Sequence, residues 1–575
     1  MDKSITGAEA LIKSLMAEGV DTVFGYPGGA ILPVYDALYD YQNELRHILV
    51  RHEQGAVHAA QGYARATGRT GVVIVTSGPG AANVITGLSD AMMDSTPLVV
   101  ITGQVGEQYL GSDAFQETDV VAITQPITKW AMQVRRAEDI SAAVARAFYI
   151  ASSGRPGPVV LDLAKDAQIG VTDWQHEPLR FLRSYNPRPD VDSDAVAAAA
   201  ELINSAERPM LLIGQGVTLA GAEAEAVELA EKAGIPVAAT LLGLSVFDTD
   251  HPLFKGMAGM HGAVGVNYNT NRADVIVAIG MRFDDRVTGN TACYAPQAKI
   301  VHIDIDQSEF DKTVKSDVAV LGDARDVLSK LIPMVKANSH DEWSSSFDRC
   351  QEIELKECIQ REIHPTDGKM TMGEVINRVM DATGGEAITV TDVGQNQMLS
   401  ARYSRFRQRR SLITSGGAGT MGFGIPAAIG AKIGKPERTV VLFCGDGGFQ
   451  MTIQELGTIM QYGVGVKMVI LNNNFLGNVR QWQNLFYNHR FSQTPMLNPD
   501  FKAIAAAYGI KGRDVASREE LGEAIKEMLN ADGAFLLNVN IDETDMVFPM
   551  TPAGKAVDFI MLSKDKMFNP EDLAL

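Results

Sequence analysis

Residues 440–474, VVLFCGDGGFQMTIQELGTIMQYGVGVKMVILNNN, contain two apolar runs separated by a glycine-rich turn and a longer segment. The runs at 440–444 and 468–471 are typical of buried strands, and 451–462 has a helical pattern. Asp446 and Asn473 follow the two strands, and the chain between them is about as long as a strand–helix–strand crossover. The pattern predicts adjacent parallel strands with both side chains at their carboxyl ends, where α/β sheets bind ligands.

These side chains indicate a magnesium and phosphate site. Asp446 offers a carboxylate oxygen and Asn473 an amide oxygen, both of the hard kind that Mg²⁺ prefers, and the carbonyl of Phe475 is a third candidate ligand. Three glycines allow backbone N–H groups to approach a phosphate closely: Gly445, Gly447 and Gly448. The alternative is an Asp-Gly turn and an Asn-rich turn that bind no metal.

The whole chain repeats the pattern of short apolar strands alternating with helices. Strands are predicted at 72–76, 98–102, 159–163, 210–213, 274–279, 300–305, 388–391, 440–444, 468–471 and 535–541. Two linkers are predicted, the proline-containing 186–190 and the polar, strand-poor 337–369. We therefore expect three consecutive α/β domains with open parallel sheets, at 1–185, 190–340 and 365–545, and a tail at 546–575 that is a candidate active-site lid.

Composition excludes some classes of function. The 575 residues carry a formal net charge of −19, which disfavours nonspecific binding to nucleic acid or an anionic membrane. The four cysteines form no CxxC motif, and no apolar stretch is long enough to span a bilayer. The N-terminus has the pattern of an amphipathic helix. We expect a cytoplasmic enzyme, or an organelle protein that has lost its transit peptide.

A second motif is RHEQ at 51–54, which lies between a predicted strand at 47–50 and a predicted helix at 55–66. Glu53 is then placed at a helix N-terminus. Taken alone, a glutamate there is a favourable partner of the helix dipole and nothing more.

Three segments resemble the pyrimidine-binding domain of thiamine diphosphate enzymes: FGYPGGAILPVYD (24–36), RHEQGAVHAAQGYARATG (51–68) and TSGPGAANVITGL (76–88). The resemblance implies that Glu53 hydrogen-bonds the cofactor's aminopyrimidine ring, whose imino tautomer takes the C2 proton. It implies that Met421 forces the cofactor to bend. Further cofactor contacts are implied for Val393, Gly394, Gln395, Asn396 and Gly419. In that family Glu53 and Asp446 come from different subunits, which implies a homodimer or homotetramer.

Longer stretches resemble acetohydroxyacid synthase, or acetolactate synthase, catalytic subunits almost end to end. They are 113–121, 153–166, 256–262, 279–290, 301–306 and 481–493. The resemblance implies that pyruvate loses CO₂ and that the resulting hydroxyethyl carbanion condenses with a second pyruvate or with 2-oxobutyrate. The products are 2-acetolactate and 2-aceto-2-hydroxybutyrate, at the first common step of branched-chain amino-acid synthesis. It also implies a small regulatory subunit as a partner.

The same resemblance implies FAD in the central domain. The residues themselves give only a GxG after a strand, which is weak, so a domain without flavin is the alternative. Flavin contacts are implied for Arg155, Gly214, Gly216, Met260, His261, Gly280, Arg282, Asp304 and Asp323.

The substrate residues are also implied by resemblance. Arg286 matches the family's cation for the carboxylate of the second 2-oxoacid, a task that suits a guanidinium; alternatively it pairs with Asp284 or Asp285 at the surface. Trp482 shapes the acceptor pocket, or is simply core. Phe115, Gln116 and Lys165 line the channel, and the backbone N–H of Gly29 faces the developing oxyanion.

The chain departs from the family pattern at Gly106, Ala164, Asn396 and Asn478; Asn396 stands where the family has histidine, at one of the implied diphosphate contacts. Two competing hypotheses are a flavin-dependent oxidoreductase of the pyruvate oxidase type and a non-catalytic relative. Arg286, Trp482 and the segment 547–554 favour the carboligase over the oxidoreductase. Retention of Glu53, Asp446 and Asn473 argues against a non-catalytic protein.

Overall fold

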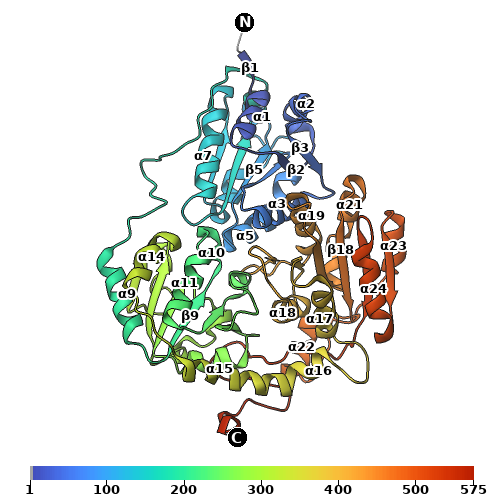
Figure 1. Ribbon diagram of the computed structural model, residues 1–575. Helices are drawn as coiled ribbons and strands as arrows, with labels where there is room; N and C mark the ends of the chain where they lie inside the picture. The colour runs from blue at the N-terminus through green and yellow to red at the C-terminus, as the bar shows by residue number, and fades with distance from the viewer. Residues whose placement is uncertain (1–3, 575) are drawn as a thin grey trace.

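The computed structural model describes residues 4–574 and contains three α/β domains arranged around a common centre (Figure 1). Each domain is built on a six-stranded sheet, and every pairing within the three sheets is parallel. The predicted fold class is confirmed. The central strands are buried on both faces, which is why they read as unbroken apolar runs.

The N-terminal domain, at the top of Figure 1, has the strand order β3-β2-β4-β5-β7-β6. Its strands are β2 Thr22–Tyr26, β3 Arg46–Leu49, β4 Gly71–Val75, β5 Leu98–Gly103, β6 Trp130–Val134 and β7 Pro158–Leu163, with the small pair β1 Ser4–Thr6 and β8 Val171–Asp173 beside them. Its helices are α1 Gly7–Ala17, α2 Leu32–Asp40, α3 Glu53–Thr67, α4 Pro79–Ala82, α5 Ile85–Met93, α6 Val120–Thr124, α7 Ile140–Ser152 and α8 Lys165–Ile169.

The central domain has the order β11-β10-β9-β12-β13-β14, which in chain order is the 3-2-1-4-5-6 arrangement of dinucleotide-binding sheets. Its strands are β9 Pro209–Ile213, β10 Val237–Ala239, β11 Phe254–Met257, β12 Val275–Ile279, β13 Lys299–Asp304 and β14 Val318–Leu321. Its helices are α9 Ser193–Ser205, α10 Gln215–Ala220, α11 Glu223–Ala233, α12 Val264–Thr270, α13 Asp285–Thr288 and α14 Ala324–Leu331.

The C-terminal domain has the order β16-β15-β17-β18-β20-β19, the same relative order as the N-terminal sheet. Its strands are β15 Ile388–Thr391, β16 Leu412–Ile413, β17 Val440–Gly445, β18 Val466–Asn472, β19 Lys511–Val515 and β20 Phe535–Asn540. Its helices are α17 Met372–Thr383, α18 Gln395–Tyr403, α19 Gly424–Gly434, α20 Asp446–Met451, α21 Leu456–Tyr462, α22 Gly477–Phe486, α23 Phe501–Ala507 and α24 Arg518–Asn530.

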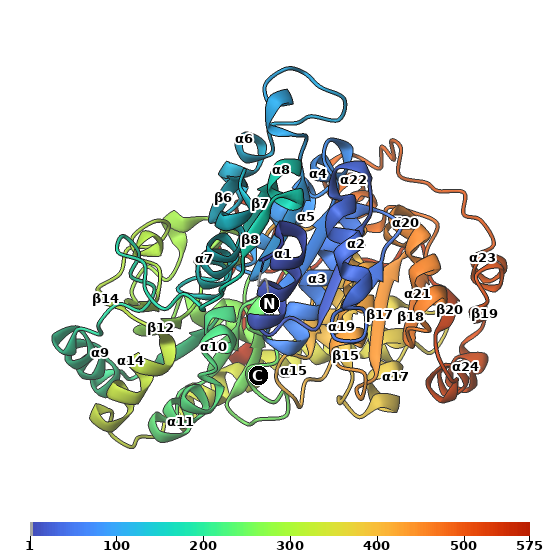
Figure 2. The ribbon, with the colours of Figure 1, turned by 90° about the horizontal axis from the view of Figure 1, so that it is seen from above.

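Helices α3 and α19 join the N- and C-terminal domains and lie side by side in Figures 1 and 2. Their backbones nearly touch: a Cβ on Gly430 would lie 1.8 Å from the Ala59 carbonyl oxygen, and one on Gly62 would lie 2.0 Å from that of Ala427. Only glycine permits this approach at the two positions.

The segment predicted as a second linker is largely helical, which is a correction. It contains α15 Asp341–Glu354, a π-helical turn Leu355–Ile359 and α16 Gln360–Ile363. The polar sequence concealed an amphipathic pattern in which Trp343, Phe347, Cys350 and Cys358 are buried against the central domain and the tail. The helical run predicted at 451–462 is also different, because α20 begins at Asp446 and the backbone is non-helical at Thr452.

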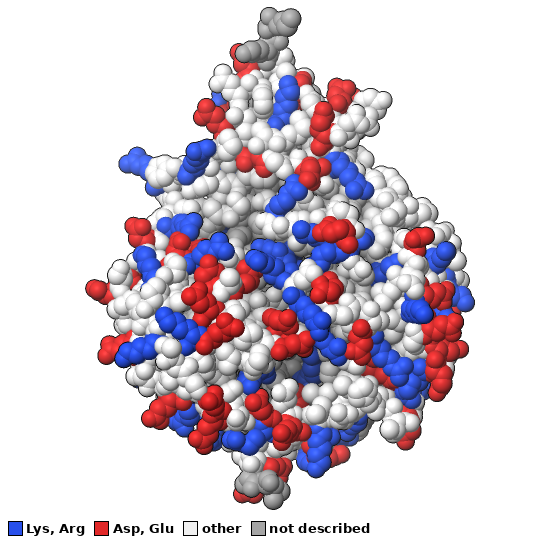
Figure 3. All heavy atoms as spheres, viewed as in Figure 1, with Lys and Arg blue, Asp and Glu red and all other residues white. Residues whose placement is uncertain are grey.

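The surface carries charged side chains of both signs. Acidic and basic side chains are interspersed over the face shown in Figure 3. No helix within residues 4–574 is both long and apolar enough to cross a membrane. All four cysteines are free thiols, and only Cys293 is exposed.

Candidate active site

The carboxyl ends of β17 and β18 bring Asp446 and Asn473 to one edge of the C-terminal sheet. The strands pair in parallel with Gly445 opposite Leu471, so the residues that follow them are neighbours. Asp446 is the first residue of α20 and is 1% exposed. Its burial raises its pKa to about 6, although a hydrogen bond of 2.6 Å from the Asn498 amide to Oδ2 opposes the rise.

These atoms fit a magnesium ion. Asp446 is buried without a cationic partner among the described residues, and a divalent cation would supply the missing charge. Asn473 is oriented by two hydrogen bonds: its Oδ1 accepts from Phe475 N at 3.2 Å, and its Nδ2 donates to Gln395 Oε1 at 3.5 Å. Within residues 4–574 no three His, Cys, Asp or Glu side chains gather as a metal cluster. A site here therefore consists of one carboxylate with amide and carbonyl oxygens.

The neighbouring loops form a cradle lined with backbone. Gly394 has φ +114°. A Cβ on Gly394 would lie 4.0 Å from the side-chain nitrogen of Asn396, and a Cβ on Gly445 would lie 3.7 Å from the same atom. Asn396 is buried, and its Oδ1 has no hydrogen-bond partner. A Cβ on Gly447 would lie 3.8 Å from the methyl group of Met421. Met421 thus lies beside the glycine turn that contains Asp446, and the unsatisfied amide oxygen of Asn396 is suited to a polar ligand.

Three further residues support these loops, and two of them, Asn498 and Gln481, were not predicted as site residues. Asp392 accepts hydrogen bonds from Gly422 N at 3.0 Å and Gly424 N at 2.9 Å, and so holds the loop that carries Met421. Asn498 contacts Asp446, and Gln481 binds Gln395 at 3.0 Å. Asp392 stood directly after a predicted strand, which was a usable signal; Asn498 lies in a long irregular segment that gave none.

Glu53 is the first residue of α3, at the strand-to-helix junction that was predicted. Its Oε2 accepts a hydrogen bond from Asn83 Nδ2 at 2.9 Å. A Cβ on Gly80 would lie 3.5 Å from its other oxygen, and Thr76, whose buried hydroxyl has no partner, adjoins the same glycine. The glutamate therefore faces loops that follow β4, beside an unsatisfied polar group.

The predicted substrate residues of this domain lie in loops and at the first residues of short helices. Gln116 has φ +59° and packs against Gly78, while Phe115 is 87% exposed. Gly29 begins a 3₁₀ turn with open space around it. Lys165 is the first residue of α8.

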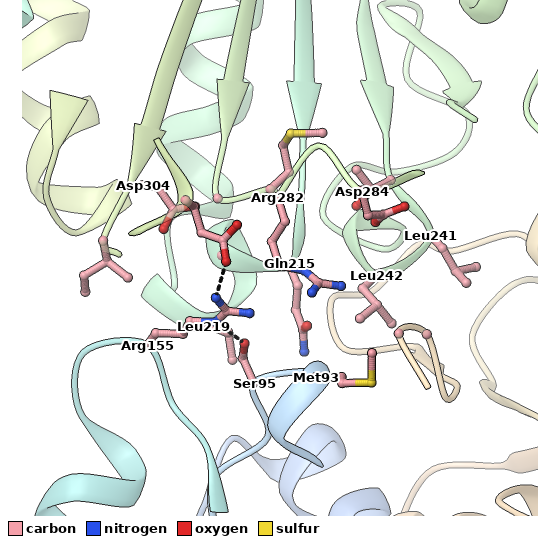
Figure 4. Close-up of a pocket in the computed structure, with 18 of the residues that line it drawn as sticks. Met93, Ser95, Arg155, Gln215, Leu219, Leu241, Leu242, Arg282, Asp284 and Asp304 are labelled. Atoms are coloured by element: carbon pink, nitrogen blue, oxygen red, sulfur yellow. Dashed lines mark hydrogen bonds and ion pairs between the residues drawn. The ribbon is translucent and has the colours of Figure 1, made fainter. Parts of the chain in front are cut away.

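A cavity of about 790 Å³ lies where the three domains meet (Figure 4). It opens at the crevice between β9 and β12, where the strand order of the central sheet reverses. Gly214 and Gly216 follow β9 and pack on Gly280 after β12, where a Cβ on either would come within 2.5 Å of the Gly280 backbone. The predicted flavin residues that line the cavity are Arg155, Gly216, Met260, His261, Gly280, Arg282, Asp304 and Asp323; Gly214 lies just outside it.

Arg155 crosses from the N-terminal domain to the central one (Figure 4). It donates to Ser95 Oγ at 2.9 Å, and its Nη1 donates to Glu309 at 2.6 Å and to Asp306 at 3.1 Å. Two groups in the wall are poorly solvated. Burial raises the pKa of Asp304 to about 6, and burial lowers the pKa of His261 to about 3, with both ring nitrogens lacking a partner. Unsatisfied polar atoms in a large crevice indicate a bound polar ligand.

Arg286 and Trp482, the two predicted acceptor residues, lie in different surroundings. Arg286 lines the cavity, its side chain is 60% exposed, and its Nη1 lies 3.5 Å from Asp285 Oδ2, so the alternative contact is present in this structure. Trp482 stacks on Phe486 with ring centroids 5.5 Å apart and packs against the tail cluster of Phe548 and Met550.

No direct bond among the described residues joins the two predicted half-sites within one chain. Among residues 4–574 no hydrogen bond or ion pair joins Glu53 to Asp446, Asn473 or Met421. Exposed apolar side chains flank both halves: Phe115 near the first, and Leu497 (99% exposed) and Met451 near the second.

Comparison with known proteins decides the family. Three family models match in order: the thiamine pyrophosphate enzyme N-terminal TPP-binding domain over residues 5–123, the central domain over 196–331 and the C-terminal TPP-binding domain over 392–539. The chain belongs to the thiamine pyrophosphate enzymes. Glu53 lies in the first matched domain and Asp446 in the last, so the two half-sites fall in the two TPP-binding domains.

Full-length relatives place the chain among the acetolactate synthases of that family. It is 45% identical over 557 residues to a probable acetolactate synthase large subunit of Methanocaldococcus jannaschii, covering 95% of this chain and 94% of the relative. It is 44% identical over 573 residues to acetolactate synthase isozyme 3 large subunit of Escherichia coli, covering 97% and 99%. It is 42% identical over 569 residues to the large subunit of Haemophilus influenzae, covering 98% and 99%.

Proposed function

We propose that this thiamine pyrophosphate enzyme is a carboligase that makes 2-acetolactate from two pyruvates and 2-aceto-2-hydroxybutyrate from pyruvate and 2-oxobutyrate. Two observations together support the proposal. Glu53 and the Asp446–Asn473 edge lie in the two TPP-binding domains, and the chain is similar to acetolactate synthases over nearly its full length. When bound, thiamine diphosphate supplies the carbon nucleophile and the electron sink for decarboxylation.

The chain's own groups divide the work. Asp446, Asn473 and the Phe475 carbonyl hold Mg²⁺, and the glycine loops after β15 and β17 bind the diphosphate. Met421 would pack against the bound cofactor. Glu53 would hydrogen-bond the cofactor's aminopyrimidine ring and assist proton transfer there. Support comes from the buried, cation-free Asp446 and from the unpartnered Asn396 Oδ1.

The cavity between the domains fits FAD. Its support is the 3-2-1-4-5-6 sheet, the close glycine contacts at the crevice and the unpartnered nitrogens of His261. Decarboxylation followed by condensation consumes and releases no electrons. We therefore assign the flavin a structural role, joining the N-terminal and central domains near Arg155.

Arg286 is assigned to the carboxylate of the second 2-oxoacid. A guanidinium binds a carboxylate well through two parallel hydrogen bonds, whereas its contact with exposed Asp285 is worth little, so substrate would displace the present contact. Trp482 limits the acceptor pocket, Phe115, Gln116 and Lys165 line its approach, and Gly29 offers a backbone N–H to the oxyanion.

The active unit is assigned as a homodimer or larger homo-oligomer. Two half-sites that do not meet in one chain are completed when a second copy brings its Glu53 to this chain's Asp446. The exposed Phe115, Met451 and Leu497 beside the half-sites are suited to burial between copies. The relatives are named large subunits, and from this we propose a small regulatory subunit as a further partner.

The test is product analysis with pyruvate and 2-oxobutyrate together, with thiamine diphosphate, Mg²⁺ and FAD present. We expect both acetohydroxyacids. Peroxide or acetyl phosphate without acetolactate would instead identify an oxidase, and failure to bind thiamine diphosphate would identify a non-catalytic relative. Glu53→Gln should lower turnover by a factor of 100 or more, on the order of the contribution of a positioned acid–base group. Glu201→Gln, exposed on α9, is the matched control.

A further inference from the structure

The junction between β3 and α3, which carries Glu53, is held by a segment of the C-terminal domain in the same chain. We name this segment, residues 455–462, the clamp. Its Glu455 accepts a hydrogen bond from Arg51 N at 3.0 Å, and the hydroxyl of Tyr462 accepts one from Leu49 N at 2.8 Å. The Arg51 guanidinium donates to the carbonyl of Gly457 at 3.1 Å and to Oε1 of Gln461 at 2.7 Å.

Glu455 is the central group of the clamp. It is 0% exposed, and its second oxygen accepts from the Thr458 hydroxyl at 2.7 Å. Burial raises its pKa, while hydrogen bonds from Thr458 and from the backbones of Arg51 and His52 oppose the rise. A buried carboxylate is costly, so its retention here needs a reason beyond packing. The N–H group that donates to it from the junction belongs to Arg51, two residues before Glu53.

The fit at this point is close. A Cβ on Gly55, in the first turn of α3, would lie 2.6 Å from Glu455 Oε1. The carboxylate therefore rests against the backbone of the turn that begins with Glu53, and a displacement of one moves the other. The glutamate's own side chain has a single hydrogen bond, from Asn83, so its direction depends on where this backbone turn lies.

The clamp also follows the metal loop in sequence. Asp446 begins α20, which ends at Met451, and Glu455 closes the next 3₁₀ turn, Ile453–Glu455. One continuous segment thus contains a metal ligand of this chain's half-site and the contact that holds this chain's Glu53. In the dimer proposed above, these belong to two different active sites.

We propose that Glu455 is a positioning residue for Glu53: its carboxylate fixes the Arg51–His52 backbone and thereby sets the direction of the glutamate toward the cofactor. This inference rests on the proposed function. Its prediction is that loss of the Glu455 contact slows the step that depends on Glu53 and leaves the diphosphate and metal half-site unchanged.

The experiment measures deuterium exchange at C2 of the bound thiamine diphosphate in acid-quenched holoenzyme, which needs no substrate, together with the Kd for thiamine diphosphate at saturating Mg²⁺. Glu455→Gln should slow exchange by about tenfold to a hundredfold, the loss associated with a small misplacement of a catalytic group. The Kd and the Tm should stay near those of Glu437→Gln, an exposed glutamate of the same domain.

A double-mutant cycle separates positioning from a general structural effect. In the Glu53→Gln background, the further change Glu455→Gln should have almost no effect on exchange, because the group it positions is already gone. A second full loss there would overturn the proposal. The proposal would also be overturned if C2 exchange in Glu455→Gln were as fast as in the Glu437→Gln control.

Tyr462→Phe is the variant to use if Glu455→Gln does not fold. It removes only the hydroxyl that accepts from Leu49 N, and exchange should slow by about threefold to tenfold on the same reasoning. Unchanged exchange would count against the clamp. If wild-type enzyme neither exchanges C2 nor forms acetolactate, the proposed function has failed. If wild type does both and the Glu455 and Tyr462 variants behave as controls, only the present inference has failed.

Discussion

The crossing of α3 and α19 offers a sharp test, because α3 carries Glu53 at its first residue. The perturbation is Gly430→Ala in α19. An added Cβ would lie 1.8 Å from the carbonyl oxygen and 2.7 Å from the carbonyl carbon of Ala59. Side chains avoid contacts below 3.0 Å, and both atoms belong to the backbone, so the helices must separate by about 1 Å or more.

The magnitude follows from two opposing effects. Alanine is favoured over glycine within a helix by about 1 kcal/mol. Overpacking costs about 1–3 kcal/mol, and more where the backbone cannot yield. We expect a net loss of about 2 kcal/mol, which for a unit of this domain's size lowers Tm by about 4–8 °C. Gly522, exposed in α24 with nothing within 4 Å of its Cβ position, is the matched control, and Gly522→Ala should raise Tm by about 2–4 °C.

The assay is thermal unfolding of both variants at one scan rate, with the Kd for thiamine diphosphate as a second measurement. Gly430→Ala should lower Tm and raise the Kd for thiamine diphosphate, because a displacement of α3 also displaces Glu53. Opposite signs for the two variants are the expected result. A rise in Tm at Gly430 equal to that at Gly522 would refute the argument that the crossing is closed by glycine.

Gly216→Val should abolish flavin binding, seen as loss of the flavin absorption band, since a Cβ there already meets the Gly280 backbone at 2.5 Å; retained flavin would move the ligand elsewhere. Trp482→Leu should lower the preference for 2-oxobutyrate over pyruvate by about tenfold or more in a competition assay, and an unchanged product ratio would remove Trp482 from the account of specificity. Burial raises the pKa of Asp162 above its ordinary 3.8 to about 6, so its contribution to stability is present in acid and is lost as the pH rises through about 6. The stability of Asp162→Asn relative to wild type should therefore increase by about 1 kcal/mol from pH 5 to pH 7, whereas a constant difference would contradict burial as the cause.

The sequence by itself determined the fold class and predicted where Glu53, Asp446 and Asn473 lie relative to their strands. Buried parallel strands must be apolar along their whole length, so β17 and β18 were visible as unbroken runs, and residues after such strands necessarily meet at one edge. Asp446 and Asn473 were found in this way. The same local logic placed Glu53 at the start of a helix.

Local patterns failed where long-range packing decides the structure. The segment that became α15 and α16 is polar on one face, and its buried face appears only when the tail and central domain are present to cover it. Asn498 was invisible for a related reason, since its contact with Asp446 joins a strand end to an irregular segment far along the chain.

The tertiary structure alone decided how the half-sites are related. It placed the predicted flavin residues around a cavity at the point where the strand order of the central sheet reverses. No single stretch of sequence encodes strand order, so the sequence alone could not show this. Among the described residues it placed no hydrogen bond between Glu53 and Asp446, and it joined Glu455 to Arg51 N, two residues before Glu53. Such contacts join residues hundreds of positions apart, where periodicity carries no information, so only the packed domains reveal them.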